Sequence, residues 1–598
     1  MSNKPQTHSF HIPVMGLAYT VDSPIKVAKY GISSVISIVD DFLIEKMNEY
    51  YSNKFKLPYN EISTKVEDYR AKRITSYLNT VDTIVKQKFE NLKKSYEDKS
   101  GELEKYIEML PDFSELKQNF KKKFENYNLK EDAIHWINNN LKAGSIDVNI
   151  MTKLDKANYS KNEQLPTEFN DAHAALRGFA NSNLESSIIL SAGMNPRLYS
   201  YFENFEDFFP NENNYLKKKI ILKVSDYRSA LIQGKFLAKK GLWVSEYRIE
   251  SGLNCGGHAF ASDGYLLGPI LEEFKNHKEA LIKDVHTILT SALESKGKSV
   301  PTEPLNLDIT VQGGVGTSDE HEFLFKKYNV DSVGWGTPFL LVPEATTVDS
   351  QTRKTLSVAK EKDLYLSNVS PLGVPFNSLN GNTNDIIRNV RIAADKSGSS
   401  CPKKFLALCL DENGRPLCTA SKKYQSKKLE ELKSENLETE EFAKQKELIT
   451  DKTCLCEGLA NAAFIDYNIE KKGEDQGVAI CPGPNMAYFD KELSLKEMIQ
   501  HIYGKTNVIS HKNRPHMFIK ELDMYVDYFS NKVHEVKGAY NLKQQKYLKT
   551  FQKNMVEGIE YYQQLFSTFE FNKESLLNDL NRLKDDFLTI QIPVFEKA

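Results

Sequence analysis

Eight short runs of β-branched and other apolar residues, separated by segments of helical character, constrain the fold of this 598-residue chain more than any other feature. A run of this kind is typical of a buried strand, and strands that alternate with helices form parallel sheets. The runs are centred on Ile12, Val35, Val148, Ile189, Ile221, Val244, Ile309 and Val333. Eight such units close a (β/α)8 barrel, whereas a doubly wound open sheet, the alternative, does not need this number. We therefore expect an α/β fold of the (β/α)8 type, a TIM barrel.

The remaining parts of the chain differ in character from these runs. Long, charged and weakly amphipathic helices are expected between the second and third runs, packed together as a hairpin that projects from the core. After about Val348 the alternation is lost, and a mixed, mainly helical C-terminal extension follows. We expect four regions: a barrel over 1–40 and 144–350, a helical insertion over 41–143, a cysteine-containing extension over 351–490, and a C-terminal helical region over 491–598.

Charge and hydropathy exclude several partner classes. The 79 basic and 81 acidic residues nearly cancel, so the composition gives no reason to expect nucleic acid as a partner. No apolar run approaches the roughly 20 residues of a membrane helix, and the polar start at Met1 is not that of a signal peptide. We expect a cytoplasmic protein that binds no membrane, and seven cysteines that are reduced thiols.

A glycine–histidine motif follows the sixth run. The stretch from Ile249 to His258 ends in Gly256, Gly257 and His258, and it leaves the carboxyl end of the expected strand, where barrels keep their chemistry. Adjacent glycines let the backbone approach a ligand closely, and an imidazole exchanges a proton near neutral pH. Taken alone, such a triplet is more often a loop with a solvated histidine.

Two further glycine motifs follow the last two runs. Gly313 and Gly314 come after the seventh run, and Gly336 and Thr337 after the eighth. In barrels these two loops commonly hold a phosphate against backbone N–H groups. The motifs therefore predict a cofactor with one terminal phosphate, such as FMN, whose ring would lie over the barrel mouth near His258.

These motifs resemble those of the nitronate monooxygenase and FMN-dependent enoyl reductase family, also described as 2-nitropropane dioxygenase-like. The segment from Gly252 to His258 is similar to its Glu-Ala-Gly-Gly-His motif, and Gln312–Val315 and Val333–Phe339 resemble its two phosphate loops. Pro13–Gly16 resembles its first strand, and Val148–Ile150 resembles its Val-Asn-Leu strand. Larger members of the family, attached to polyunsaturated fatty acid and polyketide assembly lines, act as enoyl reductases.

The resemblance implies an FMN-dependent oxidoreductase in which His258 is the active-site acid or base. His258 would take a proton alpha to a nitro group or protonate a reduced enoyl substrate. The implied cofactor contacts are Gly16, Asn149, Ser251, Gly256 and Gly257 at the ring and ribityl chain, Gly313, Gly314, Gly336 and Thr337 at the phosphate, and Lys223 beside the pyrimidine. The implied partners are a small-molecule substrate, NAD(P)H as reductant, and a second copy of the chain or an assembly-line protein.

The sequence departs from the family at three positions. Asn254 stands where the family has glutamate, Ser251 where it has glutamine, and Pro338 where it has arginine. Two alternatives therefore stay open. One is a non-catalytic barrel that acts by binding partners, and the other is a flavin-free lyase or isomerase that acts on a phosphorylated substrate.

Five cysteines of the extension are candidate ligands of an iron–sulfur cluster: Cys401, Cys418, Cys454, Cys456 and Cys481. A cysteine followed by proline, as at Cys401 and Cys481, is found in some cluster motifs. However, no C-x2-C pair is present, so buried thiols that pack as small apolar side chains are the simpler interpretation.

Overall fold

The computed structural model describes residues 7–98, 101–124, 130–160, 163–191, 193–252, 254–260, 263–471, 476–511, 513–536, 541–570 and 572–593. Within them, eight parallel strands close into a barrel in the order β1-β10-β9-β8-β7-β6-β3-β2. The strands are β1 (Phe10–Ile12), β2 (Ser33–Ser37), β3 (Ile146–Ile150), β6 (Ser187–Leu190), β7 (Lys219–Val224), β8 (Val244–Glu250), β9 (Asp308–Gln312) and β10 (Ser332–Gly334). Each predicted strand centre lies in one of these strands, so the (β/α)8 prediction is confirmed.

A small apolar cluster joins three of the barrel strands. Val35 of β2, Ile189 of β6 and Ile221 of β7 form a separate buried cluster, against which Val14 packs. Ile189 and Ile221 stand opposite each other on the neighbouring strands β6 and β7.

Helices cover the outside of the barrel. They are α1 (Ser23–Val27), α7 (Asp171–Ala180), α8 (Pro196–Tyr201), α9 (Tyr227–Ala238), α10 (Leu267–Ser295) and α11 (Ser318–Tyr328). The first helical segment shows how local sequence sets the bounds. Pro24 stands in the first turn of α1, and Gly31 ends the short 3-10 turn after it at a φ of 79°, as a helix-ending glycine does.

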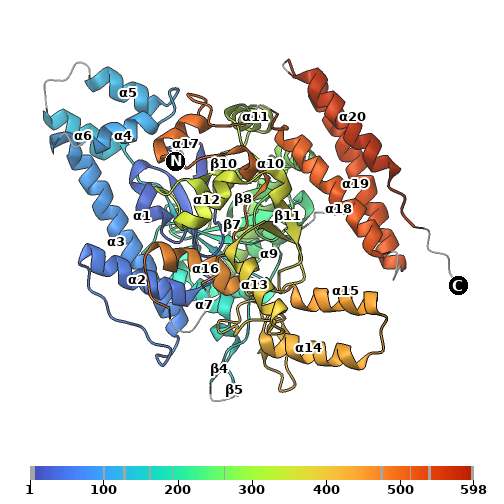
Figure 1. The fold of residues 1–598 in the computed structure, drawn as a ribbon. Coiled ribbons are helices and arrows are strands. Elements are labelled where there is room, and N and C mark those ends of the chain that lie inside the picture. Colours follow the sequence, from blue (N-terminus) through green and yellow to red (C-terminus); the bar gives the residue numbers. More distant parts are fainter. Residues whose placement is uncertain are drawn as a thin grey trace.

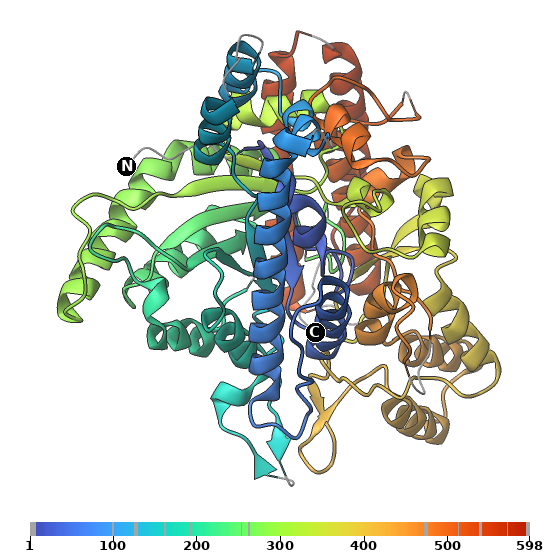
Figure 2. The ribbon, with the colours of Figure 1, turned by 90° about the vertical axis from the view of Figure 1, so that its left-hand side faces the viewer.

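The helices between β2 and β3 differ from their prediction in one respect. They are α2 (Asp41–Phe55), α3 (Tyr69–Asp98), α4 (Glu102–Met109), α5 (Glu115–Phe124) and α6 (Lys130–Asn140). The expected projecting hairpin is wrong for α3, which packs along α1, α2 and α7 with Ile74, Tyr77 and Leu78 fully buried (Figure 2). These apolar residues recur at helical spacing, so α3 serves as a covering helix of the barrel.

The extension after the barrel folds back onto it. It contains α12 (Ser350–Val358), β11 (Leu364–Ser367), β12 (Phe376–Leu379), α13 (Thr383–Ala393), β13 (Cys409–Leu410), β14 (Pro416–Leu417), α14 (Lys422–Ser434), α15 (Thr439–Thr450), α16 (Leu455–Asp466), α17 (Leu495–Ile502), α18 (Met517–Val536), α19 (Leu542–Ser567) and α20 (Lys573–Thr589). In Figure 1, α14 and α15 form a hairpin, and α18, α19 and α20 lie side by side. One hydrophobic core runs from the barrel into these elements.

A small two-stranded sheet, β4 (Tyr159–Ser160) and β5 (Glu163–Gln164), lies in the loop after β3. Among the described residues, the model contains no helix with the length and apolar character needed to cross a bilayer.

Candidate functional site

A cavity of about 380 Å³ lies at the carboxyl ends of the barrel strands. Its lining includes residues at or just after six different strands: Gly16, Asn149, Lys223, Glu250, Gln312 and Gly336. Parallel strands bring their carboxyl ends to one face of a barrel, which is where ligand sites of this fold lie. The volume falls in the range of small-molecule and cofactor sites, roughly 300 to 1,000 Å³.

The structure brings most of the predicted site residues into this cavity. Ten of the eleven predicted catalytic and cofactor-binding residues line it: Gly16, Asn149, Lys223, Gly256, Gly257, His258, Gly313, Gly314, Gly336 and Thr337. Ser251 does not line the cavity; it is buried beside Glu521 of α18. Leu253, which belongs to the glycine–histidine motif, lies outside the described residues.

The loop after β9 requires glycine at two successive positions. Gly313 has a φ of +100° and Gly314 a φ of +79°, which L side chains rarely adopt. A Cβ on Gly314 would also lie 2.0 Å from Nδ2 of Asn254, and one on Gly313 would lie 2.9 Å from the Asn254 carbonyl oxygen. The loops after β8 and β9 therefore touch at these positions, and the backbone itself forms this wall of the cavity.

Several polar atoms of the cavity lining have no hydrogen-bond partner within the described structure. They are Oδ1 of Asn149, Oε1 of Gln312, and both Oδ1 and Nδ2 of Asn254. The three side chains are at least 94% buried, since their exposed fractions are 5%, 6% and 1%. A buried polar atom without a partner costs free energy, so these atoms fit a ligand that supplies donors and acceptors.

An ion pair and a neutral amide lie together at the ends of β7, β8 and β9. Nζ of Lys223 lies 3.1 Å from Oε1 of Glu250, and Nε2 of Gln312 donates to Oε2 of Glu250 over 2.7 Å. The predicted positive charge of Lys223 is therefore paired with a carboxylate. Sequence reasoning did not select Glu250 and Gln312 as site residues, although each lies within one of the selected motifs, at the end of a strand.

The extension holds the loop that carries His258. Residues His258 and Phe376 form an antiparallel bridge, and Nδ2 of Asn377 donates to the carbonyl oxygens of Cys255 and Gly257 over 3.0 and 3.1 Å. The hydroxyl of Ser370 shares a 2.7 Å hydrogen bond with Nε2 of His258. Burial lowers the pKa of His258 to about 4, so its imidazole is neutral at pH 7.

A second segment of the extension lies over the glycine loops. The carbonyl oxygen of Cys481 would lie 2.4 Å from a Cβ on Gly256, and the Gly483 N–H donates to Oγ1 of Thr337 over 2.9 Å. Nδ2 of Asn485 donates to the Gly314 carbonyl oxygen over 2.7 Å. The Thr337 hydroxyl is thus already an acceptor for the protein. The residues missed here, Ser370, Asn377 and Asn485, carry no local sequence signal because they act across more than a hundred residues.

Arg514 also fixes the loop after β9. Its Nη2 donates to the Gly314 carbonyl oxygen over 2.8 Å, its Nε donates to Oδ1 of Asn485 over 3.0 Å, and its Nη1 pairs with Oε1 of Glu320 at 2.7 Å. Both ions of the Arg514–Glu320 pair are buried, with side-chain exposures of 6% and 4%. Such hydrogen-bonded pairs are strongly directional, so the Gly314 carbonyl is held toward the extension.

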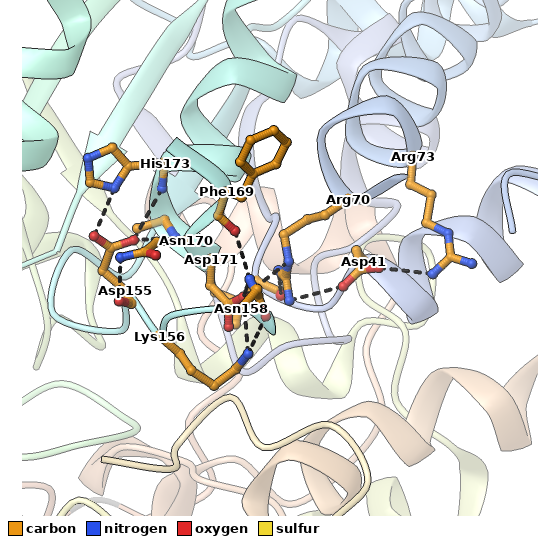
Figure 3. Close-up of polar contacts among 12 residues, drawn as sticks. Asp41, Arg70, Arg73, Asp155, Lys156, Asn158, Phe169, Asn170, Asp171 and His173 are labelled. Carbon is orange, nitrogen blue, oxygen red and sulfur yellow. Dashed lines mark hydrogen bonds and ion pairs between the residues drawn. The ribbon is translucent and has the colours of Figure 1, made fainter. Parts of the chain in front are cut away.

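An ionic network at the same face joins the loops after β2 and β3 to α3 and α7 (Figure 3). Arg70 contacts Asp41 at 3.0 Å and Asp171 at 3.4 Å, and Arg73 contacts Asp41 at 2.9 Å. The Arg70 guanidinium also lies over the ring of Phe405, 5.0 Å from its centroid. Phe405 lines the cavity, so the network holds one wall of it.

A second polar contact in Figure 3 orients α7. Nδ1 of His173 lies 2.8 Å from Oδ2 of Asp155, and Oδ1 of Asp155 accepts from the N–H groups of Ala172 and His173 at the start of that helix. A carboxylate at a helix N-terminus satisfies N–H groups that lack a partner within the helix. The loop after β3 is thereby fixed to α7.

Four of the five candidate cysteines, Cys401, Cys418, Cys454 and Cys456, interact with one another in pairs. The fifth, Cys481, lines the barrel cavity, as Cys456 also does. In the described part of the chain, no three or more cysteine, histidine, aspartate or glutamate side chains are arranged to hold a metal ion. The iron–sulfur cluster therefore stays a prediction.

No protein-family model and no curated protein matches the sequence. Among solved structures, the enoyl reductase domain of MlnA, from the macrolactin biosynthesis cluster of Bacillus amyloliquefaciens, is similar at 13% sequence identity and a TM-score of 0.30. The match covers 73% of this chain and 89% of that domain. A likeness this weak supports no conclusion about chemistry, so the candidate function depends on the cavity itself.

Proposed function

We propose that this protein is an FMN-dependent oxidoreductase that binds its cofactor and a small-molecule substrate in the barrel-mouth cavity. The observation that carries the proposal is the lining of that cavity. Glycine positions at which a Cβ would clash lie beside buried polar atoms that have no hydrogen-bond partner in the described residues. A flavin phosphate needs backbone N–H groups, and its ribityl chain and pyrimidine need donors and acceptors.

The residues of the cavity fit the cofactor in two groups. Gly313, Gly314 and Gly336 would hold the phosphate. The Thr337 hydroxyl accepts from the Gly483 N–H, and its own O–H would donate to a phosphate oxygen. Asn149, Asn254 and Gln312 have the unpartnered atoms that suit the ribityl hydroxyls and the pyrimidine edge. When bound, FMN would supply the transfer of a hydride or of electrons.

His258 would move the proton of the reaction. The imidazole of His258 is neutral at pH 7, which is the state that can accept a proton from carbon, and its lowered pKa requires that this C–H be acidic. Ser370 holds the ring in one orientation through Nε2, and the Phe376 ring packs edge-on to it with centroids 5.0 Å apart. We therefore propose a substrate with an acidic C–H beside an electron-withdrawing group, such as a nitroalkane, with an enoyl thioester as the second substrate class.

Flavin binding tests the proposal directly. The purified protein, reconstituted with FMN and freed of excess, should show a two-banded flavin absorption spectrum that bleaches on anaerobic reduction. Gly314→Ala should weaken FMN binding by at least a factor of about 100, because its Cβ strains the backbone and displaces Asn254, two effects of a few kcal/mol together. His258→Gln should bind FMN normally and lose turnover with nitroalkanes.

Gly414→Ala is the matched control for this experiment. Gly414 has a φ of +70° in the turn between β13 and β14, but a Cβ there meets nothing within 4 Å. It carries the same backbone strain far from the cavity, so it should bind FMN as the unchanged protein does. A protein that cannot be reconstituted with FMN would contradict the proposal and favour a flavin-free barrel. Tight FMN binding by Gly314→Ala would contradict only the phosphate assignment.

A further inference from the structure

A lysine at the mouth of the barrel cavity has no ionic partner. Lys153 follows β3 in the chain and lines the cavity. Two other charged residues of the lining, Lys223 and Glu250, pair with each other, and the imidazole of His258 is neutral at pH 7. Lys153 forms no ion pair or hydrogen bond with any described residue. Within the described lining, no carboxylate therefore balances its positive charge.

The backbone before Lys153 is fixed by the loop that follows β6. The N–H of Thr152 donates to Oγ of Ser191 over 2.9 Å, and the Thr152 hydroxyl donates to the Gly193 carbonyl oxygen over 2.9 Å. Nδ2 of Asn195 donates to the Thr152 carbonyl oxygen over 3.0 Å. Thr152 itself is fully buried. The fold therefore sets the point at which the side chain of Lys153 leaves the backbone.

Gly193 leaves space for the lysine side chain itself. It has a φ of +104°, and a Cβ built there would overlap Cε of Lys153 and lie 2.8 Å from its Nζ. The chain of Lys153 thus lies against the backbone of the loop after β6, in space that only a glycine leaves. Although Lys153 is exposed, this contact limits the freedom of its chain, so less entropy is lost when the amine binds a ligand.

The ring of Phe260 is a neighbour of both Lys153 and His258. Nζ of Lys153 lies 5.7 Å from the centroid of that ring, and the ring centroids of Phe260 and His258 are 6.2 Å apart. All three residues line the cavity. The amine and the imidazole are therefore no farther apart than these two distances added together, and a substrate chain of a few carbon atoms can contact both.

The position of Lys153 in the barrel separates it from the phosphate assigned above. In the closed strand order, three strands lie between β3 and β9 in either direction, and three lie between β6 and β10. The loops after β3 and β6, which hold Lys153, are therefore across the mouth from the glycine loops after β9 and β10. An anion at Lys153 is a different group from the cofactor phosphate.

We propose that Lys153 is a substrate-binding residue whose ammonium binds a carboxylate or phosphate group of the substrate while the reacting C–H lies at His258. An ammonium donates charge-assisted hydrogen bonds to either anion. This assignment rests on the proposed function, because it takes His258 as the base. The substrate class is then a small molecule with an acidic C–H at one end and an anionic group at the other.

A matched series of probes tests this site. The compounds 4-nitrobutanoate, 4-nitrobutyl phosphate and 4-nitrobutan-1-ol share one nitroalkyl chain and differ in the terminal group. Their binding to the full-length protein is measured by isothermal titration calorimetry, with and without FMN. We expect at least one anion to bind about tenfold more tightly than the alcohol, because only an anion pairs with the ammonium. The anion that binds more tightly identifies the terminal group of the substrate.

The lysine variant has a matched control. Lys153→Met should remove the preference for the anion and leave the binding of the alcohol unchanged. In protein that turns over the probes, KM for the anion should rise about tenfold while kcat stays the same. Lys239→Met is the control, because Lys239 is exposed at the end of α9, outside the cavity lining, and has no ion pair with a described residue. It removes the same charge and should keep the preference.

A second variant tests the position of the amine. Gly193→Ala places a methyl group on the path of the lysine chain, so it should weaken binding of the anion more than binding of the alcohol. Equal weakening of the two would contradict the assigned position. Equal binding of all three probes by the unchanged protein would overturn the proposal, and so would a preference that survives in Lys153→Met.

Calorimetry without FMN separates this proposal from the proposed function. A preference for anions that depends on Lys153, in a protein that cannot be reconstituted with FMN, would support the anion site and contradict the flavin enzyme. Binding of FMN without any preference for anions would support the flavin enzyme and contradict the anion site.

Discussion

The basicity of His258 is set by its surroundings at the scale of one residue. Burial opposes the charged imidazolium and lowers the pKa of His258 from 6.5 to about 4. The folded protein therefore binds this proton less tightly than the unfolded chain does. The resulting contribution to stability is present above pH 6.5 and is lost as the pH falls from about 6.5 through 4.

The lowered pKa of His258 predicts that kcat/KM falls only at low pH. If His258 is the base, kcat/KM should stay level between pH 5 and 8 and fall only as the pH approaches about 4. Carbon-detected NMR titration of 13Cε1-labelled histidine, assigned with His258→Gln, should give the same midpoint. A midpoint near 6.5 in both measurements would contradict a buried, neutral His258.

At the scale of elements, one carboxyl joins three helices of the molecule. Oε1 and Oε2 of Glu521 in α18 accept from the Leu267 N–H at the start of α10, and the Tyr562 hydroxyl of α19 donates to Oε2 over 2.8 Å. Burial dominates over these contacts and raises the pKa of Glu521 to about 7. The proton is therefore held more tightly in the folded state than in the unfolded chain.

The raised pKa predicts a pH-dependent junction. Stability from Glu521 is fully present below pH 4.5, is lost as the pH rises from about 4.5 to 7, and then stays constant, with a total change of up to about 3 kcal/mol. Glu521→Gln should remove that part of the dependence. Urea midpoints measured at pH 5, 6, 7 and 8 check this, and parallel curves for the two proteins would disprove it.

The ionic network between α2, α3 and α7 makes a second prediction at this scale. Arg70→Met should destabilise the protein by about 3 kcal/mol, because Asp41 and Asp171 stay buried and lose a cation. The control is Lys86→Met on the same helix. Lys86 pairs with Asp82 but is 71% exposed, so its loss should cost less than about 0.5 kcal/mol. Equal effects of the two changes on thermal unfolding would refute the structural role of Arg70.

At the scale of the whole molecule, barrel and extension form one folded unit. A single hydrophobic core includes Phe10 of β1 and Phe587 of α20. The extension also supplies Phe376, Cys481 and Asn485 to the cavity wall. The barrel residues alone would leave much of this apolar surface in water.

A truncation tests whether the barrel and the extension fold as one unit. A protein that ends at residue 350 should aggregate or lack cooperative unfolding in circular dichroism and calorimetry, and it should bind no FMN. Replacement of residues 427–446 by a short Gly-Ser linker is the control. It removes most of the α14–α15 hairpin, whose residues are mainly exposed, and should leave the cavity and its ligand binding intact. A well-folded product from the truncation would show that the barrel is an independent domain.

The sequence by itself determined the barrel and much of its mouth. Strand runs and glycine motifs are local signals, because β-branched residues favour strands and paired glycines permit a positive φ at Gly313 and Gly314. Eight strands connected by helices can form only a few barrel topologies. In a closed parallel barrel, the motifs at the carboxyl ends of the strands lie on one face. The division into four regions and the cofactor stay predictions.

Only the tertiary structure decided what covers that mouth. Ser370, Asn377 and Asn485 reach the glycine loops over more than 110 residues of sequence. Cys454 likewise contacts Cys401, which lies 53 residues before it. The burial of α3 against α7 is of the same kind. Such contacts depend on where the extension folds back onto the barrel. The free energy that stabilises this packing comes from burial between distant parts of the chain. No periodicity or spacing within a short segment of sequence therefore predicts it.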